Sequence, residues 1–153
     1  SGPLREKLDA IKKAKIILIN GEKNIKFENI IFDITKKNNI FYSKYSLLNI
    51  EQFKGKKIFA FAGIGNPNNF FDLLNENNLD VQKKLSFPDH YEFSKLELQK
   101  MIDQSIKNNF EIITTEKDYY RIKKFNFKKI NYLKVTLNIL EKEKFMKQIL
   151  NYL

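Results

Sequence analysis

The sequence of 153 residues contains no cysteine, no tryptophan and a single histidine, His90. Without cysteine the chain has neither a disulfide framework nor a thiolate metal site, and this composition fits a reducing compartment. One histidine without cysteine also leaves a zinc site dependent on carboxylates. The longest apolar runs, such as residues 57–62, are far shorter than the ~20 residues that span a bilayer. We therefore expect this part of the polypeptide to be soluble.

Arginine is almost as rare, since Arg5 and Arg121 are the only two, although the formal net charge is +10. Clustered positive charge can bind nucleic acid or anionic lipid through phosphate groups. The lysines, however, are spread along the chain, and bidentate recognition of phosphate favours arginine. We therefore expect no nucleic-acid partner. The charge leaves two interpretations open, a solvated lysine surface or a face that approaches an anionic membrane.

The pattern of apolar residues predicts an α/β fold. Beyond residue 57, strands expected at 57–62, 81–87 and 110–114 alternate with helices at 66–77 and 94–108, which is typical of a Rossmann-like parallel sheet with crossover helices. Ser94 and Glu97 form a predicted capping box. A short helix at 116–123, a strand at 132–137 and a terminal helix at 141–153 follow.

The first 56 residues give a less regular pattern. A helix is expected from Pro3 to Ala14 and a buried strand at 15–19, which ends at the turn residues Asn20 and Gly21. Residues 27–32 and 40–45 are predicted to be two strands joined by a polar turn. The sequence also begins without methionine and enters a helix almost at once. We therefore expect it to be the middle of a longer polypeptide.

Candidate site residues occur in three loops, each placed directly after a predicted strand. They are Gly63, Gly65 and Asn66 in the first loop, Asp89 and His90 in the second, and Thr114, Thr115, Lys117, Asp118 and, shortly beyond, Arg121 in the third. The carboxyl ends of parallel strands lie at one edge of a sheet, where α/β proteins place functional groups. The order of the loops therefore predicts one site.

Each loop has a functional and a structural interpretation. His90 can exchange a proton near neutral pH, with Asp89 setting its tautomer, or it can be a hydrogen-bonded packing residue. Gly63 and Gly65 can let the backbone approach an anion while Asn66 caps the next helix, or they can form a tight turn. Lys117 and Arg121 can bind phosphate, or they can belong to an internal salt-bridge cluster.

Four ordered motifs together resemble the C-terminal half of tetraacyldisaccharide 4'-kinase, the lipid A 4'-kinase of Gram-negative bacteria. The motifs are Gly2-Pro3-Leu4-Arg5-Glu6; Gly63-Ile64-Gly65-Asn66-Pro67 with Phe70-Phe71; Phe87-Pro88-Asp89-His90-Tyr91; and Thr114-Thr115-Glu116-Lys117-Asp118 with Arg121. The resemblance extends from Ser1 to at least Arg121. It implies a P-loop kinase with two α/β lobes joined by a two-stranded linker.

The resemblance also divides the chain and assigns its function. Residues 1–22 would end the P-loop lobe, residues 23–54 would form the linker, and residues 55–153 would form the C-terminal lobe. The implied reaction is ATP- and Mg²⁺-dependent phosphorylation of the 4'-hydroxyl of a tetraacylated glucosamine disaccharide 1-phosphate, a lipid A precursor. It would take place peripherally at the cytoplasmic face of the bacterial inner membrane.

Particular residues take roles from the same resemblance. Glu6 would help to hold Mg²⁺, and His90 with Asp89 would support a catalytic base from the N-terminal lobe. The segment from Thr114 to Asp118, with Arg121, would close the nucleotide site or would instead hold the two lobes together. No P-loop motif occurs in this sequence, so we expect this part alone to be inactive without its N-terminal P-loop lobe.

Two other functions fit the same residues. A stand-alone α/β module would bind a nucleotide or a sugar phosphate without the missing lobe. A lysine-rich module would bind nucleic acid or anionic lipid, and its binding would weaken steeply with salt, unlike binding in a pocket.

Overall fold

The computed structural model describes residues 6–36 and 39–153. These residues form two compact units. Residues 1–46 and 136–153 belong to the first, and residues 47–135 belong to the second. The chain therefore passes between the units twice, near residues 46 and 136. No helix in the described ranges combines the length and the apolar character that a membrane span requires.

The second unit is built on a four-stranded sheet in the order β4-β3-β5-β6. Its strands are β3 (Lys57–Ala62), β4 (Asp80–Ser86), β5 (Glu111–Thr115) and β6 (Ile130–Leu133), and all the neighbouring pairs are parallel. The prediction of an α/β fold with a parallel sheet is therefore confirmed. Residues 58–62 of β3 are all buried, as expected of a central strand that is covered on both faces.

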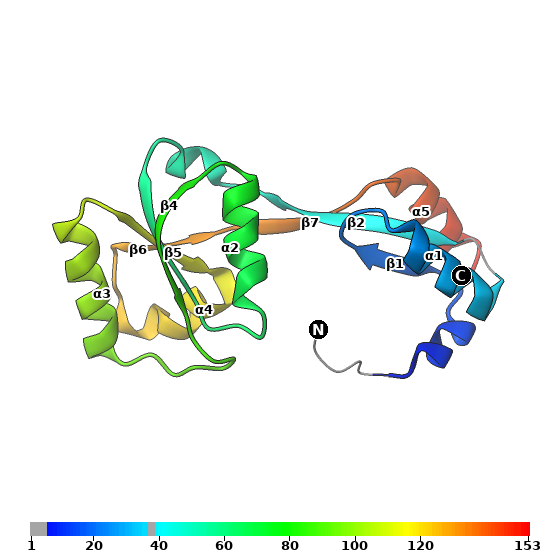
Figure 1. The fold of residues 1–153 in the computed structure, drawn as a ribbon, viewed down its shortest axis with the longest axis horizontal. Coiled ribbons are helices and arrows are strands. Elements are labelled where there is room, and N and C mark those ends of the chain that lie inside the picture. Colours follow the sequence, from blue (N-terminus) through cyan, green and yellow to red (C-terminus); the bar gives the residue numbers. More distant parts are fainter. Residues whose placement is uncertain (1–5, 37–38) are drawn as a thin grey trace. The chain divides into compact units, whose positions relative to one another are not determined.

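Helices cover both faces of this sheet (Figure 1). On one face, α2 (Pro67–Glu76) packs Phe70, Phe71 and Leu74 against Ala60. The other face holds α3 (Lys95–Lys107) and α4 (Glu116–Ile122), followed by the short 3-10 helix η3 (Lys123–Phe125). Because successive residues of a strand point to opposite faces, Phe59 belongs to the α3 side.

Capping fixes where α3 begins. The Ser94 side chain accepts a hydrogen bond from the backbone N–H of Glu97, and the Glu97 carboxylate accepts one from the Ser94 N–H at 2.9 Å. The predicted capping box is therefore confirmed. The capping box therefore fixes the point at which the loop after β4 ends and α3 begins.

The first unit contains the three-stranded sheet β1-β2-β7. Strand β1 (Ile17–Asn20) pairs in parallel with β2 (Ile40–Leu47). Strand β7 (Val135–Ile139) lies antiparallel to β2. Two backbone hydrogen bonds show the direction, since Leu140 N donates to Tyr42 O at one end and Leu48 N donates to Lys134 O at the other. The remaining elements are η1 (Leu8–Lys13), α1 (Ile25–Thr35) and α5 (Lys142–Leu150). The 3-10 helix η2 (Ile50–Phe53) precedes β3 in the second unit.

The strand predicted at residues 27–32 is wrong, because this segment lies in α1. The Asn24 side chain accepts a hydrogen bond from Phe27 N at 3.0 Å and begins the helix. Apolar residues at 27, 30, 31 and 34 have the spacing of a helical face, and Ile31 is fully buried. The predicted hairpin is therefore absent from the described residues, and β2 pairs with β1 and β7 instead.

Two other expectations change at the ends of the chain. The single strand predicted at 132–137 is two short strands, β6 and β7, which lie in different sheets. The helix expected from Pro3 to Ala14 is described as the 3-10 helix Leu8–Lys13, and its expected first residues lie outside the described ranges. Residues 136–153 belong to the compact unit that contains β1, and not to the one that contains β3. The division at residues 22 and 54 remains a prediction.

Candidate functional site

The three predicted loops lie together at the carboxyl edge of the second unit's sheet. The first two follow β3 and β4, which are neighbours in that sheet. The third is the junction where β5 passes directly into α4, so it is not a loop in the structure. All the candidate residues except Glu6 belong to this unit, and direct contacts join the loops. Glu6 is exposed and belongs to the first unit.

Asp118 is the buried centre of these contacts. Its side chain is fully buried, and its Oδ2 atom accepts hydrogen bonds from Gly63 N and from Thr115 Oγ1, both at 2.8 Å. Its Oδ1 atom pairs with an Nη1 nitrogen of Arg121 at 3.0 Å. Both carboxylate oxygens are therefore occupied by protein groups, as a buried charge requires.

The two threonines before Asp118 fix the junction of β5 and α4. The Thr115 side chain accepts a hydrogen bond from Asp118 N at 3.1 Å and caps α4. The Thr114 side chain is buried and donates to the carbonyl of Phe61 at 2.8 Å, which ties β5 to β3. This part of the loop forms the internal cluster that was one of its two predicted roles.

Arg121 joins all three loops. One terminal nitrogen, Nη1, donates to the carbonyl oxygen of Gly63 at 2.9 Å as well as to Asp118. The other, Nη2, lies 3.0 Å from the Nδ1 atom of His90. A guanidinium has only donors, so Nδ1 must accept, and the proton of the neutral imidazole is then on Nε2.

His90 and Asp89 lie on the exposed side of this network. His90 has a left-handed backbone, with φ at 61°, and its side chain is 75% exposed. Its Nε2 atom lies 3.7 Å from Asp89 Oδ2, and Lys117 Nζ lies 3.4 Å from Asp89 Oδ1. Desolvation acts to raise the pKa of Asp89, but the hydrogen bond from Lys117 opposes it, and the net pKa lies below its ordinary 3.8. Asp89 is therefore a carboxylate at neutral pH.

The glycine loop is shaped by protein neighbours. A Cβ atom on Gly63 would lie 3.3 Å from Phe93 Cζ and 3.4 Å from Asp118 Oδ1, tighter than most such contacts. Gly65 is less crowded, because a Cβ atom at that residue would lie 3.5 Å from Asp89 Oδ2, which is an ordinary contact distance. Asn66 occupies the N-cap position of α2, but its side chain donates to Asn69 Oδ1 and makes no capping bond.

Sequence reasoning missed a second polar group, which is formed by Tyr91, Ser94 and Glu97. Glu97 accepts hydrogen bonds from Ser94 Oγ and from Tyr91 Oη, both at 2.6 Å. The bond from Ser94, followed by that from Tyr91, lowers the pKa of Glu97 from 4.5 to about 2. The capping box was visible in the sequence, but the phenol of Tyr91 had no local signal that linked it to Glu97.

Comparisons with known proteins agree on one family. The family model described as Tetraacyldisaccharide-1-P 4'-kinase matches residues 1–153. A tetraacyldisaccharide 4'-kinase of Pelagibacter ubique is 39% identical over 142 residues, which cover 91% of this chain and 45% of that protein. One of Bartonella quintana is 36% identical over 124 residues, covering 80% of this chain and 36% of that protein. The chain thus spans less than half the length of these relatives.

A solved structure shares the fold. It is a crystal structure of the "apo" form of LpxK from Aquifex aeolicus in complex with ATP. The TM-score is 0.61 at 22% identity, and the match covers 97% of this chain and 45% of that one.

The burial of Asp118 leads to a prediction about stability. Asp118→Asn replaces one acceptor oxygen with a donor and leaves Arg121 without its charge partner, which costs about 3 kcal/mol. We expect urea denaturation to show that loss in the free energy of unfolding. Asp103→Asn is the matched control, because Asp103 is exposed and accepts a hydrogen bond from Gln99, one turn earlier in α3. Equal effects of the two variants would contradict the central role of Asp118.

The low pKa of Glu97 leads to a second prediction. Ser94→Ala removes its strongest hydrogen-bond donor, so the pKa of Glu97 should rise from about 2 toward 4.5, and Tyr91→Phe should raise it less. A lowered carboxyl pKa stabilises the fold above about pH 4.5, and this contribution is lost as the pH falls through about 2. Carbon-detected NMR titration of the Glu97 carboxyl measures both shifts, and a larger shift in Tyr91→Phe would reverse the assignment.

Proposed function

Because this chain belongs to the tetraacyldisaccharide-1-P 4'-kinase family, we propose that it is the C-terminal part of a lipid A kinase. The complete enzyme transfers a phosphoryl group from ATP to the 4'-hydroxyl of a tetraacylated glucosamine disaccharide 1-phosphate. The observation that carries this proposal is the family match along the whole chain. A P-loop lobe in the rest of the polypeptide is part of the proposal, since the chain covers 45% of the Pelagibacter relative.

His90 and Lys117 are the groups that we assign to the reaction. Phosphoryl transfer depends mainly on alignment of the hydroxyl nucleophile and on neutralisation of the phosphate oxygens. The exposed imidazole carries its proton on Nε2 and can donate it in a hydrogen bond to the catalytic base, which lies in the other lobe. The side chain of Lys117 is 51% exposed, and its ammonium group supplies positive charge beside Asp89.

ATP and Mg²⁺ are the proposed cofactors. The Aquifex aeolicus structure is described as a complex with ATP, which supports ATP as the phosphoryl donor here. Within the described ranges, no three or more acidic or histidine side chains gather into a group that could hold a metal ion. As the family resemblance implies, Glu6 would supply one ligand to Mg²⁺. The other ligands would come from outside this chain. We assign a supporting role at the nucleotide site to the residues at the carboxyl edge of the sheet. They are Gly63, Gly65, Asn66, Thr114, Thr115 and Arg121.

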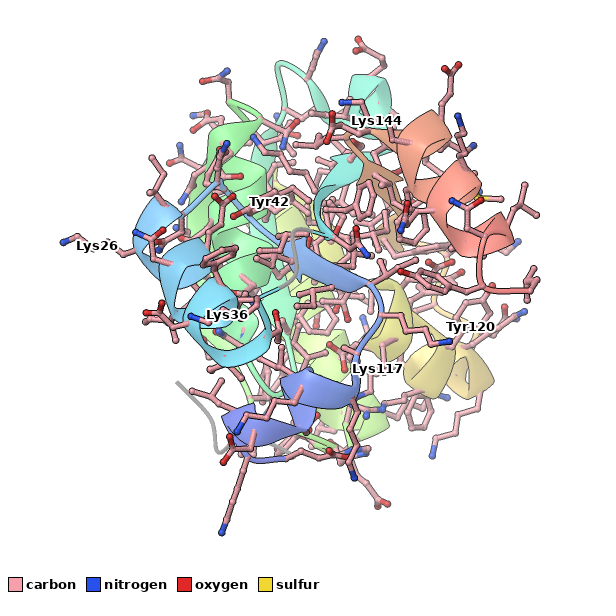
Figure 2. All side chains as sticks on the ribbon, turned by 90° about the vertical axis from the view of Figure 1, so that its right-hand side faces the viewer. Lys26, Lys36, Tyr42, Lys117, Tyr120 and Lys144 are labelled. Carbon is pink, nitrogen blue, oxygen red and sulfur yellow. The ribbon has the colours of Figure 1, made fainter. Side chains whose placement is uncertain are left out.

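The inner membrane is the proposed place of action, because the acceptor is a lipid. The chain has a formal net charge of +10. Lys26 extends outward from α1 in the first unit (Figure 2). Lysines of this kind attract anionic lipid headgroups, each by about 1 kcal/mol near the surface. We therefore assign a peripheral position at the cytoplasmic face, with no nucleic-acid partner.

The isolated 153-residue chain should have no kinase activity. Positioning and charge neutralisation supply most of the catalysis in such enzymes, and this chain contains no P-loop motif. The assay supplies ATP, Mg²⁺ and the lipid disaccharide, and it measures phosphate transfer with and without the N-terminal part of the polypeptide. Turnover by the isolated chain would refute this prediction. Salt-resistant ATP binding by that chain would instead favour a stand-alone nucleotide-binding module.

Replacement of His90 tests the catalytic assignment. In the complete enzyme we expect His90→Ala to lower kcat by a factor on the order of 10², the size of a lost acid–base partner. Glu92→Ala is the control, because Glu92 is exposed in the same loop and has no assigned role. Circular dichroism should show the same fold for both variants. An unchanged kcat in His90→Ala would make His90 a structural residue.

A further inference from the structure

From the contacts of Arg121 we infer that this residue is a positioning residue for His90. Held in place by Asp118, Arg121 fixes the imidazole with Nδ1 as the hydrogen-bond acceptor and Nε2–H as its only donor. The consequence for catalysis rests on the proposed function, but the positioning itself does not.

The two terminal nitrogens of Arg121 have separate partners. Nη1 donates to Asp118 Oδ1 at 3.0 Å and to the Gly63 carbonyl at 2.9 Å, which joins α4 to the loop after β3. Nη2 lies 3.0 Å from Nδ1 of His90, on the loop after β4. The Nη1 contacts are sufficient to link β3 and β5, so the Nη2 contact requires another explanation.

The anchor of this arrangement is buried, whereas the ring that it holds is exposed. The side chain of Asp118 is fully buried, and that of Arg121 is 25% exposed. A buried pair of this kind has a defined geometry, unlike an ion pair between two mobile surface side chains. The guanidinium is therefore presented to His90 in a fixed orientation.

His90 gains little orientation from its other neighbours. Its side chain is 75% exposed, and Asp89 Oδ2 lies 3.7 Å from Nε2, beyond hydrogen-bond distance. Asp89 Oδ1 accepts a hydrogen bond from the backbone N–H of His90 at 3.0 Å, which orders the loop and not the ring. Among the residues that the structure describes, Arg121 is thus the group within hydrogen-bond distance of the imidazole.

Fixing Nδ1 determines what the ring can do. Occupied by Arg121, Nδ1 is not available to accept a proton from a substrate, so the free side of the ring presents Nε2–H. In the proposed reaction the imidazole therefore acts as a donor to an anionic oxygen. Arg121 acts through His90 and not through direct contact with the reacting atoms.

The single histidine makes this inference directly measurable, because every imidazole NMR signal of the 153-residue chain belongs to His90. The experiment records ¹⁵N shifts and ring ¹³C relaxation at a pH where the imidazole is neutral. We expect an ordered ring with Nδ1 unprotonated. In Arg121→Met the Nδ1–H tautomer should increase severalfold and the ring should become more mobile. Lys117→Met is the matched control, since Lys117 contacts Asp89 and not the ring.

Arg121→Lys is the second variant, and it decides the matter if Arg121→Met fails to fold. A lysine keeps the charge beside Asp118 but has no second nitrogen for His90, so the tautomer should change while the fold remains. An unchanged tautomer and ring mobility in a folded Arg121 variant would overturn the inference, as would a wild-type ring as mobile as a free imidazole. These measurements involve no phosphoryl transfer, so they stand apart from any failure of the proposed function.

Discussion

The candidate site depends on one buried carboxylate, that of Asp118. An isolated buried charge is costly, and it becomes tolerable only when it is paired and hydrogen-bonded. Here the partners are Gly63 N, Thr115 Oγ1 and the guanidinium of Arg121. Each comes from a segment at the edge of the sheet, so satisfying the charge also joins the loop after β3 to the junction of β5 and α4. Arg121 extends the connection to His90 in the loop after β4.

This constraint explains the need for glycine at position 63. Its N–H must reach Asp118, and a Cβ atom at that position would crowd Phe93 at 3.3 Å and Asp118 at 3.4 Å. The sequence favoured either a ligand or a tight turn as the reason for the small residue. The contacts favour close packing of protein groups, because the neighbours of Gly63 are an aromatic ring and a carboxylate of the same chain.

Strong local signals made much of the second unit predictable. The capping box at Ser94 and Glu97 located α3, and the apolar run at residues 58–62 of β3 indicated a central strand. Residues 27–32 misled because an apolar cluster without clear alternation fits a short strand as well as a helical face. The helix is stabilised by the hydrogen bond from Phe27 N to the Asn24 side chain and by the burial of Ile31. These depend on tertiary packing as well as on local sequence.

The site itself was predictable as a location but not as a network. Because the ends of parallel strands meet at one edge, the order of the three loops was sufficient to gather Gly63, His90 and Asp118. Sequence could not show which polar groups face one another. Sequence left Asp118 either at a nucleotide site or in an internal cluster, and in the structure both of its oxygens accept hydrogen bonds from the protein. Burial distinguishes these cases, and burial follows from the packing of α4 on the sheet.

The exposure of the network increases from its centre to its rim, and this order suits a positioning role. Asp118 is fully buried, Arg121 is partly buried, and His90 and Lys117 are exposed. A rigid, charged centre can hold exposed groups in place at little entropic cost during a reaction, because their order is established when the protein folds. Phosphoryl transfer requires this kind of order, since most of its catalysis is alignment. In the reaction that we propose, the pair of Asp118 and Arg121 therefore contributes to chemistry that it does not touch, because it determines which nitrogen of His90 faces the solvent.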